Sequence, residues 1–344
     1  MSNHPLQTDV AIVGAGPVGL FAVFECGMLN MTCHVIDALP STGGQCSALY
    51  PEKPIYDIPG FPKLLAHDLV TRLEEQAAPF KPVYHLGQQV VALSARDGGR
   101  WLVETSAGSR IEATVVLIAA GVGAFGPNRP PIPGIEAYEQ GPPGHGVCYM
   151  VRRREDFRGR KVVIAGGGDS AVDWTLALAD VAERVAVVHR RDKFRAAPDS
   201  VRKLHALAGQ GAVDLVVPFQ LDDIEGEGGA LKAVIVRDLD GDARRLPADA
   251  LLPFFGLSQQ LGPIAEWGLE LQRHHIVVDP ATCATRRPGI FAIGDIVTYP
   301  GKLKLILTGF AEAATAAHAM YALVHPGEAL HFEYSTTKGL PKAQ

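Results

Sequence analysis

Two short apolar runs in this chain each lead into a glycine-rich turn and a stretch with helical spacing. The first run, Val10–Val13, lacks polar alternation, which predicts a strand buried on both faces. The turn Gly14–Gly19 follows it, and a second apolar strand over Cys33–Ile36 leads directly into Asp37. Strand, glycine turn, helix, strand and acid in this order predict a dinucleotide-binding unit.

The spacing of the glycines in this turn suits a bound pyrophosphate. Gly14 permits the tight turn, Gly16 lets backbone N–H groups approach the phosphates, and Gly19 allows the helix to pack closely on the strand. Asp37 lies 23 residues after Gly14, where a carboxylate accepts hydrogen bonds from an adenosine ribose. A turn of some other α/β protein is the alternative interpretation, and the complete context of five elements argues against it.

The same pattern returns from Lys161 onward, with Gly166 lying 152 residues after Gly14 and Ala171 in place of the third glycine. Cations stand where the first unit has its acid, and guanidinium groups suit a ribose 2′-phosphate. We therefore predict FAD or NAD in the first unit and NADP(H) in the second, although a solvated basic turn is the alternative. The residues predicted for this second site are Gly166, Gly168, Asp169, Ser170, His189, Arg190, Arg191 and Arg195.

Weaker patterns place the remaining elements. A small β-meander is predicted over residues 90–94, 101–104 and 110–112, followed by a separate buried strand over 115–120 and a connector over 126–146. Later come helices over 198–208 and 307–323, strands near 213–218, 233–237 and 251–255, and a hairpin turn at Asp240-Gly241. Asp295 comes at the end of an apolar strand within Pro288–Asp295. It is predicted either to bind a polyol or a phosphate-linked sugar or to cap the helix that follows.

Composition excludes several classes of function. The 344 residues are 47% hydrophobic and 20% charged, with a net charge of −5, which is typical of a globular protein and argues against a nucleic-acid binder. The N-terminus lacks the basic start and apolar core of a signal peptide, and no apolar run reaches the ~20 residues that span a bilayer. The five cysteines contain no Cys-x-x-Cys pair, so we expect reduced thiols, a cytoplasmic protein and no metal site.

Charge is distributed unevenly along the chain. Residues 151–203 hold 13 Lys/Arg and 8 Asp/Glu, a local balance of +5. Some of these cations are assigned to the predicted NADP(H) site. Arg152–Arg154 are candidates for attracting an acidic partner protein, and a solvated face is the alternative.

Four stretches together resemble the two-dinucleotide flavoproteins, and most closely the thioredoxin-reductase-like ferredoxin–NADP reductases. They are the first glycine turn, the Gly44-Gln45 pair, His-Arg-Arg-Asp-Lys-Phe-Arg-Ala from His189, and Gly-Ile-Phe-Ala-Ile-Gly-Asp ending at Asp295. The resemblance covers essentially the whole chain. Thioredoxin reductases carry a Cys-Ala-Thr-Cys pair after a Gly-Val-x-Tyr stretch. Here Gly146–Tyr149 is followed by Met-Val-Arg-Arg, so electron transfer to a disulfide by that route is excluded.

Two further stretches, Leu49–Pro62 and the tail His331–Lys338, resemble the ferredoxin reductase branch. The resemblance implies that Tyr50 stacks on one face of the flavin and that Tyr334 covers the other, with Thr336 near the ring. It implies that catalysis needs no group beyond the flavin and these stacking residues. Two departures are Val18, where a hydroxyl residue is frequent, and Asp37, where Glu is common. The FAD contacts carried over are Gly14, Gly16, Val18, Gly19, Asp37, Gln45, Tyr50, Val90 (through its backbone, to adenine), Phe125, Asp295 and Thr336.

The expected fold is α/β, with two Rossmann-like, three-layer dinucleotide-binding domains. An NADP(H) domain (residues 122–253) is inserted in a discontinuous FAD domain (residues 1–121 and 254–344). The resemblance implies hydride transfer between NADPH and FAD, coupled to single-electron transfer with ferredoxin or flavodoxin, in a homodimer. The alternatives are an NADPH-dependent flavin monooxygenase or other flavin reductase, and a flavin-binding sensor without turnover.

Overall fold

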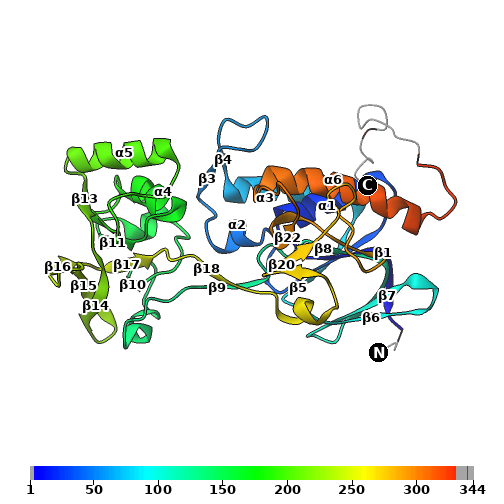
Figure 1. Ribbon diagram of the computed structural model, residues 1–344, viewed down its shortest axis with the longest axis horizontal. Coiled ribbons are helices and arrows are strands. Elements are labelled where there is room, and N and C mark those ends of the chain that lie inside the picture. Colours follow the sequence, from blue (N-terminus) through cyan, green and yellow to red (C-terminus); the bar gives the residue numbers. More distant parts are fainter. Residues whose placement is uncertain (1–3, 331–338, 340–344) are drawn as a thin grey trace. The chain divides into compact units, whose positions relative to one another are not determined.

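The computed structural model describes residues 4–330 and 339 and divides the chain into two compact units. The first unit takes the chain up to Phe125 and again from Gln259, and the second unit is the intervening Gly126–Ser258 (Figure 1). Where the chain passes between them, β9 (Ala124–Pro127) and β18 (Leu257–Gln260) pair with each other as a two-stranded sheet.

The first unit is built on a seven-stranded sheet with the order β5-β2-β1-β8-β7-β6, and β21 pairs with β8 off this path. The parallel part contains β1, β2, β5, β8 and β21, whereas β6 and β7 add an antiparallel meander. The strand bounds are Leu6–Val13 (β1), Cys33–Asp37 (β2), Val83–Leu86 (β5), Val90–Ala95 (β6), Trp101–Thr105 (β7), Arg110–Ile118 (β8) and Ile290–Ala292 (β21).

The strand β8 corrects the prediction of two strands over 110–112 and 115–120. It runs unbroken through residues 113 and 114, and its first half pairs with β7 while its second half pairs with β21. Its burial alternates at the start and is complete at the end, because the second half lies between parallel neighbours β1 and β21.

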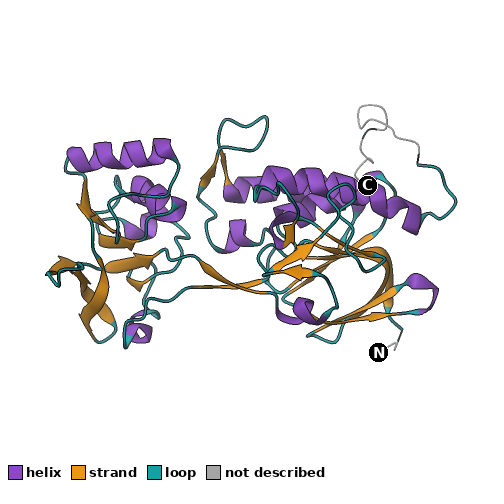
Figure 2. Cartoon of the chain, viewed as in Figure 1, coloured by secondary structure: helices purple, strands orange, loops and turns teal. Residues whose placement is uncertain are grey.

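Three helices gather over one face of this sheet: α1 (Pro17–Met28), α3 (Ala66–Ala77) and α6 (Ile306–Val324) (Figure 2). One apolar cluster joins Val10 and Ile12 of β1 to Val23 of α1 and Ala316 of α6. A second cluster, on the other side of the same strands, joins Val13 of β1 to residues from the chain after Gln259. Each of these two clusters therefore contains residues from both chain segments of the first unit.

The second unit repeats the strand–turn–helix pattern in a parallel sheet with the order β10-β17-β11-β12-β13. The strands are Gly146–Val147 (β10), Lys161–Ala165 (β11), Arg184–Val188 (β12), Val213–Val216 (β13) and Ala250–Pro253 (β17), and the helices are Asp169–Leu178 (α4) and Pro198–Gly209 (α5). The α/β fold with two Rossmann-like units is confirmed, as is the helix predicted over 198–208.

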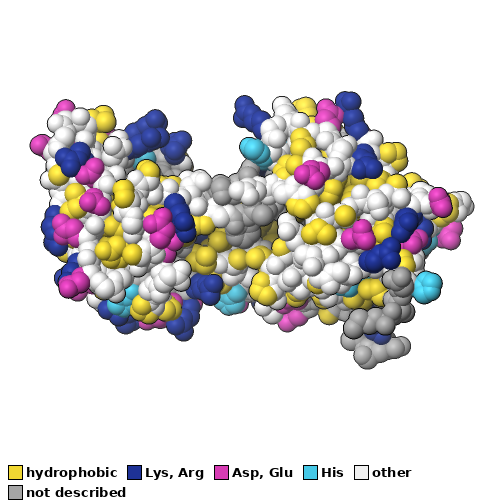
Figure 3. Space-filling view, turned by 90° about the horizontal axis from the view of Figure 1, so that it is seen from below, with side chains coloured by type: hydrophobic (Ala, Val, Ile, Leu, Met, Phe, Trp, Pro, Cys, Tyr) yellow, Lys and Arg dark blue, Asp and Glu magenta, His cyan; other side chains and the backbone are white. Residues whose placement is uncertain are grey.

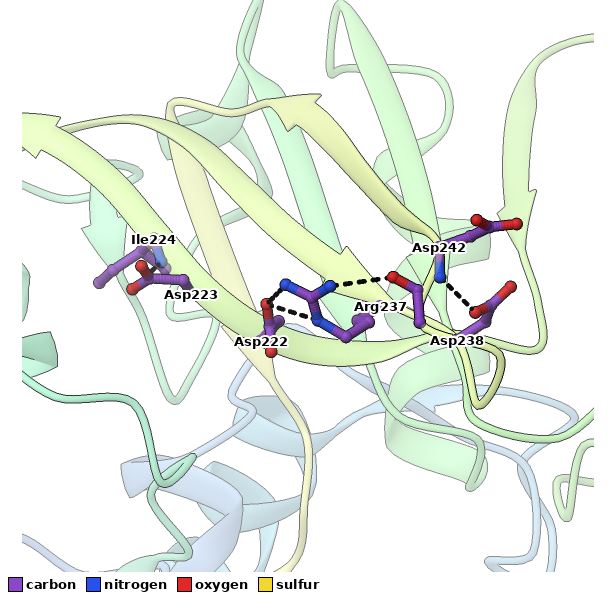
Figure 4. A network of polar contacts seen from close by, with 7 residues as sticks. Asp222, Asp223, Ile224, Arg237, Asp238 and Asp242 are labelled. Carbon is purple, nitrogen blue, oxygen red and sulfur yellow. Dashed lines mark hydrogen bonds and ion pairs between the residues drawn. The ribbon is translucent and has the colours of Figure 1, made fainter.

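An antiparallel sheet of β14 (Gln220–Glu227), β15 (Ala230–Arg237) and β16 (Ala243–Pro247) completes the second unit. At the end of β15, the Arg237 guanidinium donates hydrogen bonds to the Asp222 carboxylate of β14 and to the Gly241 carbonyl oxygen (Figure 4). The turn predicted at Asp240-Gly241 connects β15 to β16, and Asp238 accepts the N–H groups of Asp240 and Asp242 there.

Short elements fill the remaining connections. In the first unit they are α2 (Gln45–Ala48), β3 (Pro54–Ile55), β4 (Leu64–Leu65), η1 (Ala78–Phe80), η2 (Asp97–Gly99), η5 (Gly262–Glu266), β19 (Leu271–Gln272), β20 (His275–Val277), η6 (Gly294–Ile296) and β22 (Val297–Thr298). In the second unit they are η3 (Ile135–Tyr138) and η4 (Arg154–Phe157). None of the helices in the described part of the chain is long and apolar enough to cross a membrane.

Candidate functional site

A cavity of about 330 Å³ opens in the first unit at the carboxyl ends of its parallel strands. This is where open α/β sheets bind ligands. Its walls come from the turn after β1, the ends of β2 and β8, α2, and the chain around η5 and η6. Eight of the residues predicted to bind FAD line it: Gly14, Gly16, Val18, Asp37, Gln45, Tyr50, Val90 and Asp295.

The remaining predicted FAD residues are Gly19, Phe125 and Thr336, of which Gly19 does not line this cavity. Gly19 lies beneath the turn, Phe125 belongs to β9, and Thr336 lies outside the described residues, as does Tyr334.

The glycine turn is closed by backbone contacts that leave no room for side chains. A Cβ at Gly14, where φ is +115°, would lie 2.4 Å from the Ala119 carbonyl oxygen. One at Gly19 would lie 2.0 Å from the Gly14 carbonyl oxygen. Around Gly16, by contrast, a Cβ would meet no atom within 4 Å. The open side of the turn is at Gly16, where α1 begins and its N–H groups are free to receive an anion.

Asp37 fastens the turn to the end of β2. Its Oδ2 accepts the Ala15 N–H at 2.6 Å, and its Oδ1 accepts the Leu39 N–H at 2.8 Å. Burial raises the pKa of this carboxyl, and the two N–H donors act against that shift. Each carboxylate oxygen keeps a second lone pair for an outside donor, so the acid can shape the turn and bind a ribose together.

Tyr50 lines the cavity and packs against a buried apolar cluster that includes Leu20, Cys46 and Ile58. Its hydroxyl lies 3.9 Å from the Cys46 Sγ. Burial raises the pKa of the Cys46 thiol to about 11 and raises that of Tyr50 as well. Both groups are therefore neutral near pH 7, and Tyr50 offers a ring rather than a charge.

Several cavity residues had no recognisable sequence signal. Gln88 and Gln89 precede β6, whereas Ile264 and Trp267 come from the chain near η5. The register of β6 against β7 shifts between Val90 and Ala92. Such bulges interrupt strand pairing next to binding sites, and a one-residue irregularity leaves no pattern in the sequence.

The turn of the second unit has the same construction. Gly166 has φ +149°, and a Cβ there would lie 2.8 Å from the Phe254 carbonyl oxygen. Ala171 fits the third glycine position because Gly166 has no Cβ: an atom added there would lie 3.1 Å from the Ala171 Cβ, which is a tight contact. A Cβ at Gly168 would meet nothing within 4 Å, which matches the open side found at Gly16.

The residues around this second turn differ in exposure. Arg190, Arg191 and Arg195 are exposed, and the Arg195 N–H donates to the Gly167 carbonyl oxygen at 2.6 Å. His189 is buried, with 8% exposure, and its ring fills the space beside Gly167. Burial and then the neighbouring arginine charges lower the pKa of His189, so His189 supplies packing while the arginines supply the positive charge.

Asp169 and Ser170 open α4 and are exposed. The Asp169 carboxylate accepts the Ala197 N–H at 2.9 Å, which ties the helix start to the segment after the arginines. Together these contacts gather all eight predicted NADP(H) residues around one glycine turn within the second unit.

The cations proposed to attract a partner protein are partly neutralised. Arg153 pairs with Asp156 at 2.6 Å and Arg154 with Asp180 at 2.6 Å, while Arg152 is exposed. Figure 3 shows basic and acidic side chains interspersed over this unit. Asp156 and Asp180 are already included in the balance of +5, so these pairs leave the net charge of residues 151–203 unchanged and place two of the three arginines beside carboxylates.

Comparisons with known proteins agree with this geometry. Residues 8–320 match the family model described as pyridine nucleotide-disulphide oxidoreductase. The "Ferredoxin--NADP reductase" of Paramagnetospirillum magneticum is 65% identical over 99% of this chain and 100% of its own length. The protein of the same name from Rhodospirillum rubrum is 62% identical over 98% of each chain.

Solved structures resemble the chain in fold. The thioredoxin reductase of T. acidophilum superposes with a TM-score of 0.79 at 22% identity, covering 92% of this chain and 98% of its own. The thioredoxin reductase of Lactococcus lactis gives 0.78 at 24% identity, covering 92% and 99%.

Proposed function

The chain belongs to the pyridine nucleotide-disulphide oxidoreductase family and, within it, to the ferredoxin–NADP reductases, and from this membership we propose that it is an FAD-dependent ferredoxin–NADP(+) reductase. It transfers a hydride between NADPH and FAD and exchanges single electrons with a small redox protein. Bound flavin supplies the chemistry that joins these steps, because it takes up two electrons together and returns them one at a time.

The observation that carries this proposal is the contrast between the two glycine turns. The first is closed by the Asp37 carboxylate, and the second is flanked by the exposed guanidinium groups of Arg190 and Arg191. A carboxylate suits a free ribose hydroxyl, and guanidinium suits a 2′-phosphate. The isolated Cys148 offers no dithiol for reducing a disulfide.

FAD fits the residues of the first unit, the proposed FAD domain. The N–H groups at the start of α1 bind the pyrophosphate beside Gly16, and Asp37 binds the adenosine ribose. Tyr50 provides a neutral aromatic face for the flavin, and Asp295 accepts hydroxyl donors of the flavin's sugar chain. Gln45 and Val90 complete the set from α2 and β6.

The second unit is the proposed NADP(H) domain. Arg190, Arg191 and Arg195 bind the 2′-phosphate, and the N–H groups at Gly168 and α4 bind the pyrophosphate. His189 supports them by packing on Gly167. Tyr334 and Thr336, outside the described residues, are proposed to cover the flavin from the tail, so that Tyr334 must move before nicotinamide reaches the ring.

The proposed electron carrier and oligomeric state are those that the resemblance to ferredoxin–NADP reductases implies. Ferredoxin is the proposed carrier, with flavodoxin as a second carrier of the same single-electron type, in a cytoplasmic homodimer.

The test of function begins with the purified protein. A flavin absorption spectrum, bleaching by NADPH much faster than by NADH, and reduction of ferredoxin are expected. Thioredoxin should not be reduced, since no vicinal thiols lie near the second turn. A colourless protein that cannot be reconstituted with FAD would overturn the proposal, and stoichiometric insertion of oxygen into a substrate would favour a monooxygenase instead.

Specificity for NADPH is tested by Arg190→Gln combined with Arg191→Gln. Hydrogen bonds to charged groups contribute about 1.5–3 kcal/mol, and exposure reduces that to about 1–2 kcal/mol for each arginine. Because the two share one phosphate and are not additive, KM for NADPH should rise by about 30-fold to a few hundred-fold, with KM for NADH nearly unchanged. The matched control is Arg202→Gln, an exposed arginine of α5 paired with Asp199. Equal losses with both coenzymes would contradict the phosphate role.

The tail is tested by Tyr334→Ala. We expect a shifted flavin spectrum and altered hydride-transfer rates, because the variant uncovers one face of the ring. An unchanged spectrum together with unchanged rates would remove Tyr334 from the site.

A further inference from the structure

A buried ion pair lies behind the cavity of the first unit. Glu312 of α6 and Lys302 of the loop before it have side chains that are 6% and 5% exposed. Their Oε1 and Nζ atoms are 2.5 Å apart. Neither residue lines the cavity.

The Glu312 carboxylate accepts donors from three residues: Tyr299, Lys302 and Gly294. Its Oε1 accepts the Tyr299 hydroxyl at 2.6 Å in addition to Lys302. Its Oε2 accepts a single bond, from the Gly294 N–H at 2.7 Å. One oxygen of the carboxylate therefore holds the loop, and the other holds the turn that carries Asp295.

That turn needs a fixed support. Gly294 has φ +80°, a conformation that favours glycine, and both Gly294 and Asp295 line the cavity. Just before it, the Ile293 N–H donates to the Ile118 carbonyl oxygen of β8 at 2.9 Å. Just after it, β22 begins at Val297. Within the turn, the Gly294 N–H is held by Glu312, a residue that does not line the cavity.

Stability alone is a poor reason for this pair. Removing two charges from water costs about as much free energy as their attraction returns, so apolar replacements of similar volume are often neutral or stabilising. What an apolar pair lacks is an acceptor for the Gly294 N–H. A buried N–H without a partner is costly, and the turn would rearrange to find one.

We propose that Glu312 is a positioning residue for FAD binding: by accepting the Gly294 N–H it holds Asp295 in the orientation that meets the cofactor. Lys302 and Tyr299 keep the carboxylate in place by occupying its other oxygen. This inference rests on the proposed FAD function and assigns to it a residue that does not contact the cavity.

The test compares two double variants that both lack the buried charges. Glu312→Gln with Lys302→Met keeps a carbonyl acceptor for the Gly294 N–H, whereas Glu312→Leu with Lys302→Met removes it at similar volume. Apoproteins are prepared and titrated with FAD, and the dissociation constant is read from quenching of flavin fluorescence. The thermal midpoint of each apoprotein is measured in parallel.

We expect the Leu/Met variant to bind FAD at least tenfold more weakly than the Gln/Met variant, with apoprotein midpoints that do not follow this order. Lys304→Met is the control, and it should bind FAD within threefold of the unaltered protein. Lys304 lies in the same loop but bonds to His275 rather than to Glu312.

The inference is overturned if the two double variants bind FAD within threefold of each other. It is also overturned if the Leu/Met variant does not fold, because Glu312 would then be a folding residue. Failure of the unaltered apoprotein to bind FAD would instead refute the proposed function, so the two failures are distinguishable.

Discussion

Replacing Gly309 by alanine perturbs a close contact between α6 and α1. An added methyl group would lie 2.4 Å from Val18 Cγ2 and 3.2 Å from Val18 Cγ1. Carbon atoms in good contact are about 3.5–4.0 Å apart, so one pair overlaps by about 1 Å. Either Val18 leaves its rotamer or α6 moves away from α1.

The magnitude follows from two opposing effects. Overpacking of this kind costs about 1–3 kcal/mol, and alanine's better helix propensity returns at most about 1 kcal/mol. Gly309→Ala should therefore lower the free energy of unfolding by up to about 2 kcal/mol. In a Val18→Ala background the nearest remaining atom of residue 18 is its Cβ, at 3.4 Å, which is an ordinary contact. The overlap is then absent, and the alanine at 309 should be neutral or slightly stabilising.

The assay is urea unfolding of the apoprotein for the parent, the two single variants and the double variant. We expect a coupling free energy of about 1–3 kcal/mol between positions 18 and 309. Because Val18 also lines the cavity, Gly309→Ala should weaken FAD binding, and Val18→Ala should restore part of that loss. Single effects that add to within about 0.5 kcal/mol would refute the close packing on which this prediction depends.

Three further outcomes are expected. Asp37→Asn should lower the unfolding free energy by about 1.5–3 kcal/mol, since an amide can accept only one of the two N–H groups that the carboxylate accepts; an unchanged urea midpoint would contradict this. His34 and His85 form a buried pair whose pKa values are lowered, mainly by burial, so below pH 6.5 the unfolded chain binds protons that the folded chain does not. The free energy of unfolding should be level above pH 6.5 and should fall below it by at most about 1.4 kcal/mol per pH unit for each histidine. The fall should be shallower in a His34→Leu/His85→Leu variant. Identical pH curves for the two proteins would show that this pair does not cause the pH dependence. Arg152→Gln should reduce the salt dependence of ferredoxin reduction if Arg152 attracts the carrier, and an equal slope would place Arg152 on a solvated face.

The sequence was most informative where one local signal determines the structure. Gly14 and Gly166 were recognised because a tight turn between a buried strand and a helix admits only glycine, and both have positive φ. The helix over 198–208 was recognisable from its proline start and apolar spacing, and α5 begins at that Pro198. Signals of this kind depend on neighbours in the chain, so they are readable without the fold.

What stayed hidden depends on contacts between distant segments. Trp267 lines a cavity that is also lined by residues at the ends of β1 and β2. No sequence pattern around residue 267 predicts this position. Glu312 looked like one polar residue in an alanine-rich helix, but its carboxylate is buried by Tyr299 and Lys302. His189 stood beside two arginines and was grouped with them as a cation, while the fold turns its ring inward against Gly167.

The interrupted order of the first unit bears on how the protein is made. Its strand β21 pairs with β8, yet about 170 residues separate them along the chain. The second unit is one continuous segment and emerges from the ribosome complete while the first sheet still lacks that strand. Synthesis proceeds from the N-terminus, and domains fold as units. Until β21 has been synthesised, the edge of β8 with which it pairs is therefore exposed to solvent. Chaperones that recognise apolar β-edges would find their target on the nascent chain in that interval.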